Sequence, residues 1–172
     1  MSTPIKTFWI EPSGRVEITT HFKDGREEKR RYSKEEGDHE WAVKRSADSA
    51  IEHRGMSPLY TLPDGTEATS RAVPAGALFH ASWLEDFAEF RGADGIALVV
   101  RLPNGHDWLV DSKASNCTRK DDKVHKCWCR HGDPRTGSLH VDKAGDTCAA
   151  GAGSIQSGDY HGFLQHGYLV QC

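Results

Sequence analysis

The chain has 172 residues, of which 37% are hydrophobic, so it is long enough to bury one core or one core with an N-terminal extension. Its formal net charge of −3 argues against a nucleic-acid partner, and no apolar stretch is long enough to cross a membrane. The N-terminus lacks the basic and apolar regions of a secretion signal. We therefore expect a cytosolic protein whose five cysteines are metal-bound or free rather than bridged.

The N-terminal part, residues 1–73, is expected to form a β-hairpin and a charged extension. Alternation of apolar and polar residues predicts two strands within residues 7–22, joined by a turn at residues 12–14. Residues 23–40 combine charges of both signs with few apolar side chains, which is typical of a solvated loop or a frayed helix. We expect that this segment can be shortened with little loss of stability.

Two similar turns lie in the middle of the chain. Residues 62–65 and 102–105 each place proline second and glycine fourth, which favours a β-turn between antiparallel strands. Between them, residues 81–91 carry the best apolar stripe at helical spacing. The sequence therefore predicts a mainly β (α+β) fold, with a compact antiparallel sheet domain, one or two short helices and a C-terminal half rich in cysteine and histidine.

Residues 74–172 are expected to form this Cys/His-rich β domain, in one continuous globular unit with the N-terminal part. All five cysteines and six of the ten histidines lie within residues 106–172. Every second residue from 125 to 131 is a potential metal ligand, and in a strand these four side chains would point to one face. The outermost pair would be roughly 20 Å apart, too far for one ion, so further ligands must come from other segments.

The ligand set that this reasoning favours is a zinc ion held by three thiols and one histidine. The candidates are Cys117, Cys127, Cys148, His131 and His161. His140 and Cys172 are further candidates. The alternative is that these residues are buried thiols and hydrogen-bonded imidazoles lining an ordinary sheet.

A glycine-rich segment at residues 145–155 surrounds Cys148. Small residues let backbone amides approach an anion or another part of the chain closely, although the segment lacks the lysine of a P-loop. Close packing alone also explains this composition. Cys148 is in addition a candidate nucleophile, with His161 or His131 as its base.

The last segment, residues 160–170, alternates aromatic and aliphatic residues around two His-Gly steps. This pattern predicts a final hairpin with residues 165–167 at its tip. We expect His166 to be exposed there and His161 to lie near the core. The aromatic residues are expected to pack in the domain rather than to stack on bases.

Several motifs occur together in residues 74–172. They include Cys-Ala-Ala-Gly-Ala-Gly-Ser-Ile at 148–155, Tyr-His-Gly-Phe-Leu at 160–164 and His-Lys-Cys-Trp at 125–128. In this combination the chain resembles a family of small uncharacterised proteins encoded by tailed bacteriophages and prophages. The resemblance implies viral origin and expression in the host cytoplasm, and it implies no particular activity.

Three functions are compatible with these observations. The favoured one is a non-enzymatic, zinc-stabilised interaction module that acts on a host or phage protein, without nucleic-acid or membrane partners. The second is a thiol- or metal-dependent enzyme centred on Cys148 with His161 or His131. The third is a structural component of the virion.

Overall fold

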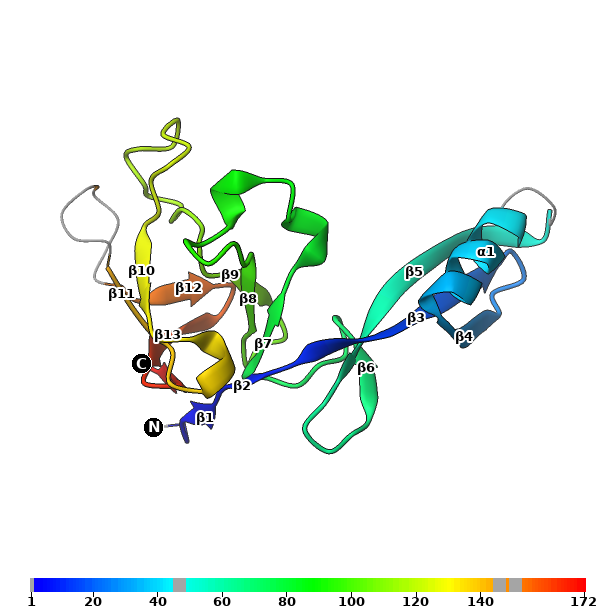
Figure 1. The fold of residues 1–172 in the computed structure, drawn as a ribbon, viewed down its shortest axis with the longest axis horizontal. Coiled ribbons are helices and arrows are strands. Elements are labelled where there is room, and N and C mark those ends of the chain that lie inside the picture. Colours follow the sequence, from blue (N-terminus) through cyan, green and yellow to red (C-terminus); the bar gives the residue numbers. More distant parts are fainter. Residues whose placement is uncertain (1, 45–48, 144–147, 149–152) are drawn as a thin grey trace. The chain divides into compact units, whose positions relative to one another are not determined.

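A computed structural model describes residues 2–44, 49–143, 148 and 153–172. The chain divides into two compact units, Ile10–Val73 on one side and Met1–Trp9 with Pro74–Cys172 on the other. Both units are built mainly from β-strands, and every strand pairing in the described residues is antiparallel except one. The predicted mainly β fold is therefore confirmed (Figure 1).

The unit Ile10–Val73 contains one four-stranded sheet with the strand order β4-β3-β5-β6 and a helix that follows β4. Its elements are β3 (Glu11–Phe22), β4 (Glu27–Ser33), α1 (Lys34–Lys44), β5 (Ile51–Thr61) and β6 (Glu67–Thr69). The predicted hairpin within residues 7–22 is wrong, because β3 runs on through this segment with only a register shift between Pro12 and Val16. The hairpin turn is at Gly25 instead, whose φ of 86° suits glycine.

Residues 23–40 are likewise not a solvated loop. Residues 27–33 of this segment form β4, which pairs with β3 along its whole length, and the helix α1 begins directly after it. An alternating apolar pattern does not predict β4, because its side chains are charged on both faces. Ion pairs stabilise it instead, such as that between Arg31 and Glu17, at 3.0 Å.

The second unit contains two four-stranded sheets and a separate two-stranded ribbon. The first sheet has the order β1-β14-β13-β12, formed by Ile5–Lys6, Tyr168–Gln171, Tyr160–Gln165 and Ile155–Ser157. The second has the order β2-β7-β8-β9, formed by Phe8–Trp9, Ala77–His80, Leu98–Arg101 and Asp107–Leu109. The ribbon pairs β10 (Trp128–His131) with β11 (His140–Lys143).

The predicted turns are confirmed, whereas the predicted helix is not. Hydrogen bonds close the turns from Gly65 to Leu62 and from Gly105 to Leu102, at 2.9 and 3.0 Å. The final hairpin joins β13 and β14 with His166 exposed at its tip, as expected. Residues 81–91 contain two single-turn 3-10 helices, η1 (Ser82–Leu84) and η2 (Ala88–Phe90), rather than one α-helix.

One hydrophobic core joins the elements of this unit. It contains buried residues of β7, β8, β9, β11, β12, β13 and β14, with Leu98, Leu139 and Leu164 fully enclosed. Trp128 of β10 packs edge-on against Trp108 of β9, at 5.3 Å between ring centroids. The core thus anchors both ends of the segment between β9 and β10. No described helix is both long and apolar enough to cross a membrane.

Candidate metal centre

Residues 110–127 connect β9 to β10 and contain no strand, although the structure describes all of them. Local hydrogen bonds shape this connection instead. The Asp122 carboxylate accepts the backbone N–H groups of Val124 and His125 at 2.9 and 3.1 Å, and these bonds lower the pKa of Asp122. The Cys127 N–H donates to the Ser112 carbonyl at 3.2 Å, which brings the end of the connection back to its beginning.

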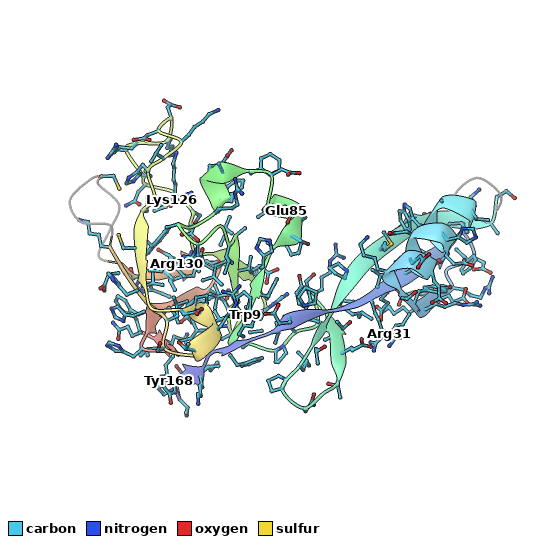
Figure 2. All side chains as sticks on the ribbon, viewed as in Figure 1. Trp9, Arg31, Glu85, Lys126, Arg130 and Tyr168 are labelled. Atoms are coloured by element: carbon cyan, nitrogen blue, oxygen red, sulfur yellow. The ribbon has the colours of Figure 1, made fainter. Side chains whose placement is uncertain are left out.

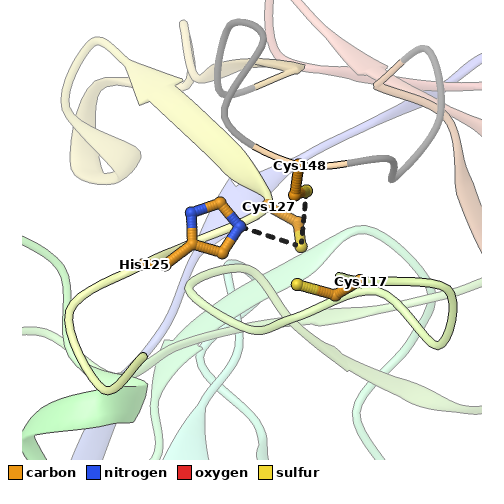
Figure 3. A group of neighbouring side chains, drawn as sticks. All are labelled: Cys117, His125, Cys127 and Cys148. Carbon is orange, nitrogen blue, oxygen red and sulfur yellow. Dashed lines mark hydrogen bonds between the residues drawn. The ribbon is translucent and has the colours of Figure 1, made fainter. Parts of the chain in front are cut away.

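This folding back assembles four potential metal ligands. One ligand atom from each of Cys117, His125, Cys127 and Cys148 lies within 4.8 Å of every other (Figure 3). The Cys127 sulfur is 3.6 Å from His125 Nε2 and 3.8 Å from the Cys148 sulfur. The first three residues are buried and Cys148 is half-buried, so the cluster could bind a metal ion inside the protein.

The distances agree with those of a tetrahedral site. A zinc ion with Zn–S bonds of about 2.3 Å and a Zn–N bond of about 2.0 Å separates two sulfur ligands by about 3.8 Å and a sulfur from a nitrogen ligand by about 3.5 Å. The observed separations of 3.8 and 3.6 Å match both values. These two edges fit a four-coordinate ion, and the remaining ligand atoms all lie within 4.8 Å of one another.

The electrostatic environment also suits a cation. Burial, together with the neighbouring thiols of Cys117 and Cys148, raises the pKa of Cys127 to about 11. Burial and the nearby Arg119 lower the pKa of His125, so its imidazole stays neutral, as a metal ligand must be. The Arg119 N–H donates to the Cys117 sulfur at 3.3 Å, a contact that would stabilise a thiolate there.

Three of the five residues predicted as metal ligands lie in this cluster, namely Cys117, Cys127 and Cys148. The histidine beside them is His125, whereas the prediction named His131 or His161. His131 is exposed on β10 and lies 3.7 Å from Asp142. His161 is exposed on β13, so its expected place near the core is wrong. Neither is among the residues that surround Cys148 in the cluster.

The strand expected over residues 125–131 is shorter in the structure. Strand β10 begins only at Trp128, so residues 125–127 are irregular and can turn two ligands toward one point. In a regular strand the same two side chains would be about 6.6 Å apart. The only local signal for the pair is the His-Lys-Cys spacing itself.

The other two cysteines are not members of this cluster. Cys129 and Cys172 are exposed free thiols. Within residues 145–155, positions 145–147 and 149–152 lie outside the described residues, so the structure does not address the predicted anion-binding turn.

A surface groove lies beside the cluster. It has a volume of about 870 Å³ and is lined by residues of the segments 88–94, 123–126 and 128–132, together with Asp111. Among these lining residues Arg130, labelled in Figure 2, forms ion pairs with Asp111 and Asp94, at 3.0 and 2.6 Å. Val124, with 86% of its surface exposed, and Lys123 belong to the wall that also carries His125.

Comparisons with models of protein families, with curated proteins and with solved structures found no match to this chain. The resemblance to phage proteins therefore remains an expectation.

Proposed function

We propose that residues 74–172 form a non-enzymatic interaction module stabilised by a structural zinc ion bound to Cys117, His125, Cys127 and Cys148. The observation that carries this proposal is the agreement of the sulfur–sulfur and sulfur–nitrogen separations, 3.8 and 3.6 Å, with the edges of a zinc tetrahedron. Three thiolates and one imidazole form a donor set that favours zinc over hard ions such as magnesium.

The arrangement supports a structural role for this ion rather than a catalytic one. Four protein ligands fill a tetrahedral site, whereas a catalytic zinc keeps one position for water or substrate. The enzyme alternative also loses its proposed bases, because His131 and His161 are both on exposed strand positions outside the cluster.

The ion would fix a segment that is held by local hydrogen bonds and not by strand pairing. Residues 110–127 contain no strand, and a metal bound by Cys117 and Cys127 would hold both ends of their loop. That loop includes Val124 and forms one wall of the groove. Zinc binding would therefore determine the shape of this wall of the groove. Its exposed Val124 and Lys123 side chains suit a peptide segment that carries an apolar side chain and acidic residues.

The interaction can be tested with a display library of acidic peptides, using the zinc-loaded full chain. Selected peptides should bind the native protein, and Val124→Asp should weaken binding because it places a negative charge at the groove. A matched control is Val43→Asp, at an exposed valine of α1 in the other unit. Peptides that bind equally well after zinc removal, or equally well to Val124→Asp, would contradict the proposal.

The partner expected from the phage resemblance is a host or phage protein, and the virion role remains an alternative.

A further inference from the structure

A second group of potential metal ligands lies on the ribbon β10–β11. Cys129 pairs with Asp142, and His131 pairs with His140, in the antiparallel register. Directly opposed residues share a face, and alternate residues of one strand share it too, so all four side chains are on the same face of the ribbon. A thiol, two imidazoles and a carboxylate thus occupy four adjacent positions.

The side chains already converge on the carboxylate. One oxygen of Asp142 is 2.9 Å from His140 Nε2, and the other is 3.7 Å from His131 Nε2. His131 and Asp142 are exposed, with 61% and 57% of their side-chain surfaces accessible, whereas His140 is mostly buried. The two imidazoles therefore approach one carboxylate from opposite strands at a surface that ions can reach.

The ring of His140 is held in place from its other side. His166, at the tip of the hairpin between β13 and β14, stacks on it with ring centroids 4.5 Å apart and an angle of 24° between the planes. His166 has a φ of 49°, a left-handed conformation that is uncommon for residues other than glycine. We assign His166 a positioning role, because a stacked ring cannot bind the same ion as its neighbour.

We propose that this face is a second metal site, which binds a late first-row divalent cation such as Zn²⁺ through His131, His140 and Asp142, with Cys129 as a fourth donor. Imidazole, carboxylate and thiolate together favour zinc, nickel or copper ions over magnesium and calcium. This site depends on none of the four residues of the buried cluster.

The second site is expected to exchange its ion more readily than the buried one. It is exposed, and its ligands must rotate, since the ring centroids of His131 and His140 are 6.1 Å apart. The buried Nδ1 of His140 also lacks a hydrogen-bond partner among the described residues. Tight metal sites normally give that nitrogen an acceptor, which makes the imidazole a stronger ligand.

Calorimetric titration with Zn²⁺ tests this proposal on full-length protein from which loosely bound metal has been removed by gel filtration. The native chain should take up one further equivalent. The double variant His131→Ala/Asp142→Asn should bind that equivalent at least about tenfold more weakly. The control His161→Ala removes an exposed histidine outside this group and should leave the affinity unchanged. Absence of the further equivalent, or equal affinity in the double variant, would overturn the proposal.

The rate of cysteine alkylation provides a second measurement of metal binding that is independent of calorimetry. Added Zn²⁺ should slow the reaction of Cys129 with iodoacetamide and leave the reaction of Cys172, another exposed thiol, unchanged. Slowing should disappear in His131→Ala/Asp142→Asn. Equal rates at Cys129 with and without Zn²⁺ would remove it from the ligand set.

Discussion

At the scale of single residues, substitution of one thiol of the buried cluster tests the proposed zinc site. Cys117 is the residue to change, because it is buried and belongs to the loop rather than to a strand. Cys117→Ser should abolish tight zinc binding and lower the free energy of unfolding of this unit by roughly 3 kcal/mol or more. Denaturant melts and elemental analysis measure both effects. Cys172→Ser, at an exposed thiol, is the control, and equal losses in the two variants would contradict the assignment.

A second prediction at this scale concerns thiol reactivity without metal. Since burial raises the pKa of Cys127 to about 11, its thiolate fraction should be small at neutral pH and rise about tenfold per pH unit up to that value. The rate of iodoacetamide labelling at Cys127, read by peptide mass spectrometry in metal-free folded protein, should follow this rise. Cys148 should also react slowly at pH 6. Fast labelling of Cys148 at pH 6 that His161→Ala abolishes would favour the enzyme instead.

Three of the four residues in the cluster were predictable from the sequence, because thiols concentrated in a chain expected to be cytosolic are more often metal ligands than disulfide partners. The histidine ligand is harder to predict. Six histidines lie in residues 106–172, and the choice depends on where a strand begins. Trp128, the first residue of β10, packs against Trp108, and this contact between distant parts of the chain is not visible in a local sequence pattern.

At the scale of elements, turns were predictable and charged strands were not. The Pro-Gly turns at residues 62–65 and 102–105 form as expected, since proline fixes φ locally and glycine adopts the positive φ, 83° and 81°, at the end of each turn. Strand β4 carries no alternating apolar pattern, because ion pairs and backbone hydrogen bonds to β3 hold it. Removing residues 23–40 would thus delete a paired strand, and the expectation that they can be shortened at little cost loses its basis.

The packing of α1 on β3 gives a prediction for this element. Gly37 lies so close to Val16 that an added Cβ would be 2.2 Å from a valine methyl group. Gly37→Ala should therefore destabilise the unit by about 1 kcal/mol, even though alanine favours helices by a similar amount. Gly55→Ala is the control, because nothing lies within 4 Å of a Cβ at that position.

The same pair allows a rescue experiment. In a Val16→Ala background the space for the new methyl group exists, so Gly37→Ala should then be neutral or stabilising. Denaturant melts of the four proteins give the coupling free energy. Additive effects of the two substitutions would show that α1 does not pack on Val16.

At the scale of the whole molecule, the metal site belongs to one of two compact units. Chelation of zinc should therefore raise hydrogen exchange in residues 110–131 and leave the β3–β5 pairing of the unit Ile10–Val73 protected. Exchange mass spectrometry with and without chelator makes the comparison. A uniform rise across both units would mean that they unfold together and that the ion stabilises the entire chain.

The zinc content of the purified protein is the measurement that decides whether the buried cluster is a metal site. Protein made without a chelating tag and freed of loosely bound ions should contain about one zinc per chain. A strong chelator should remove that zinc and lower the stability of the unit that contains it, because structural zinc contributes folding free energy. Less than about 0.2 zinc per chain, with a stability that the chelator does not change, would contradict the assignment of Cys117, His125, Cys127 and Cys148 as a structural zinc site.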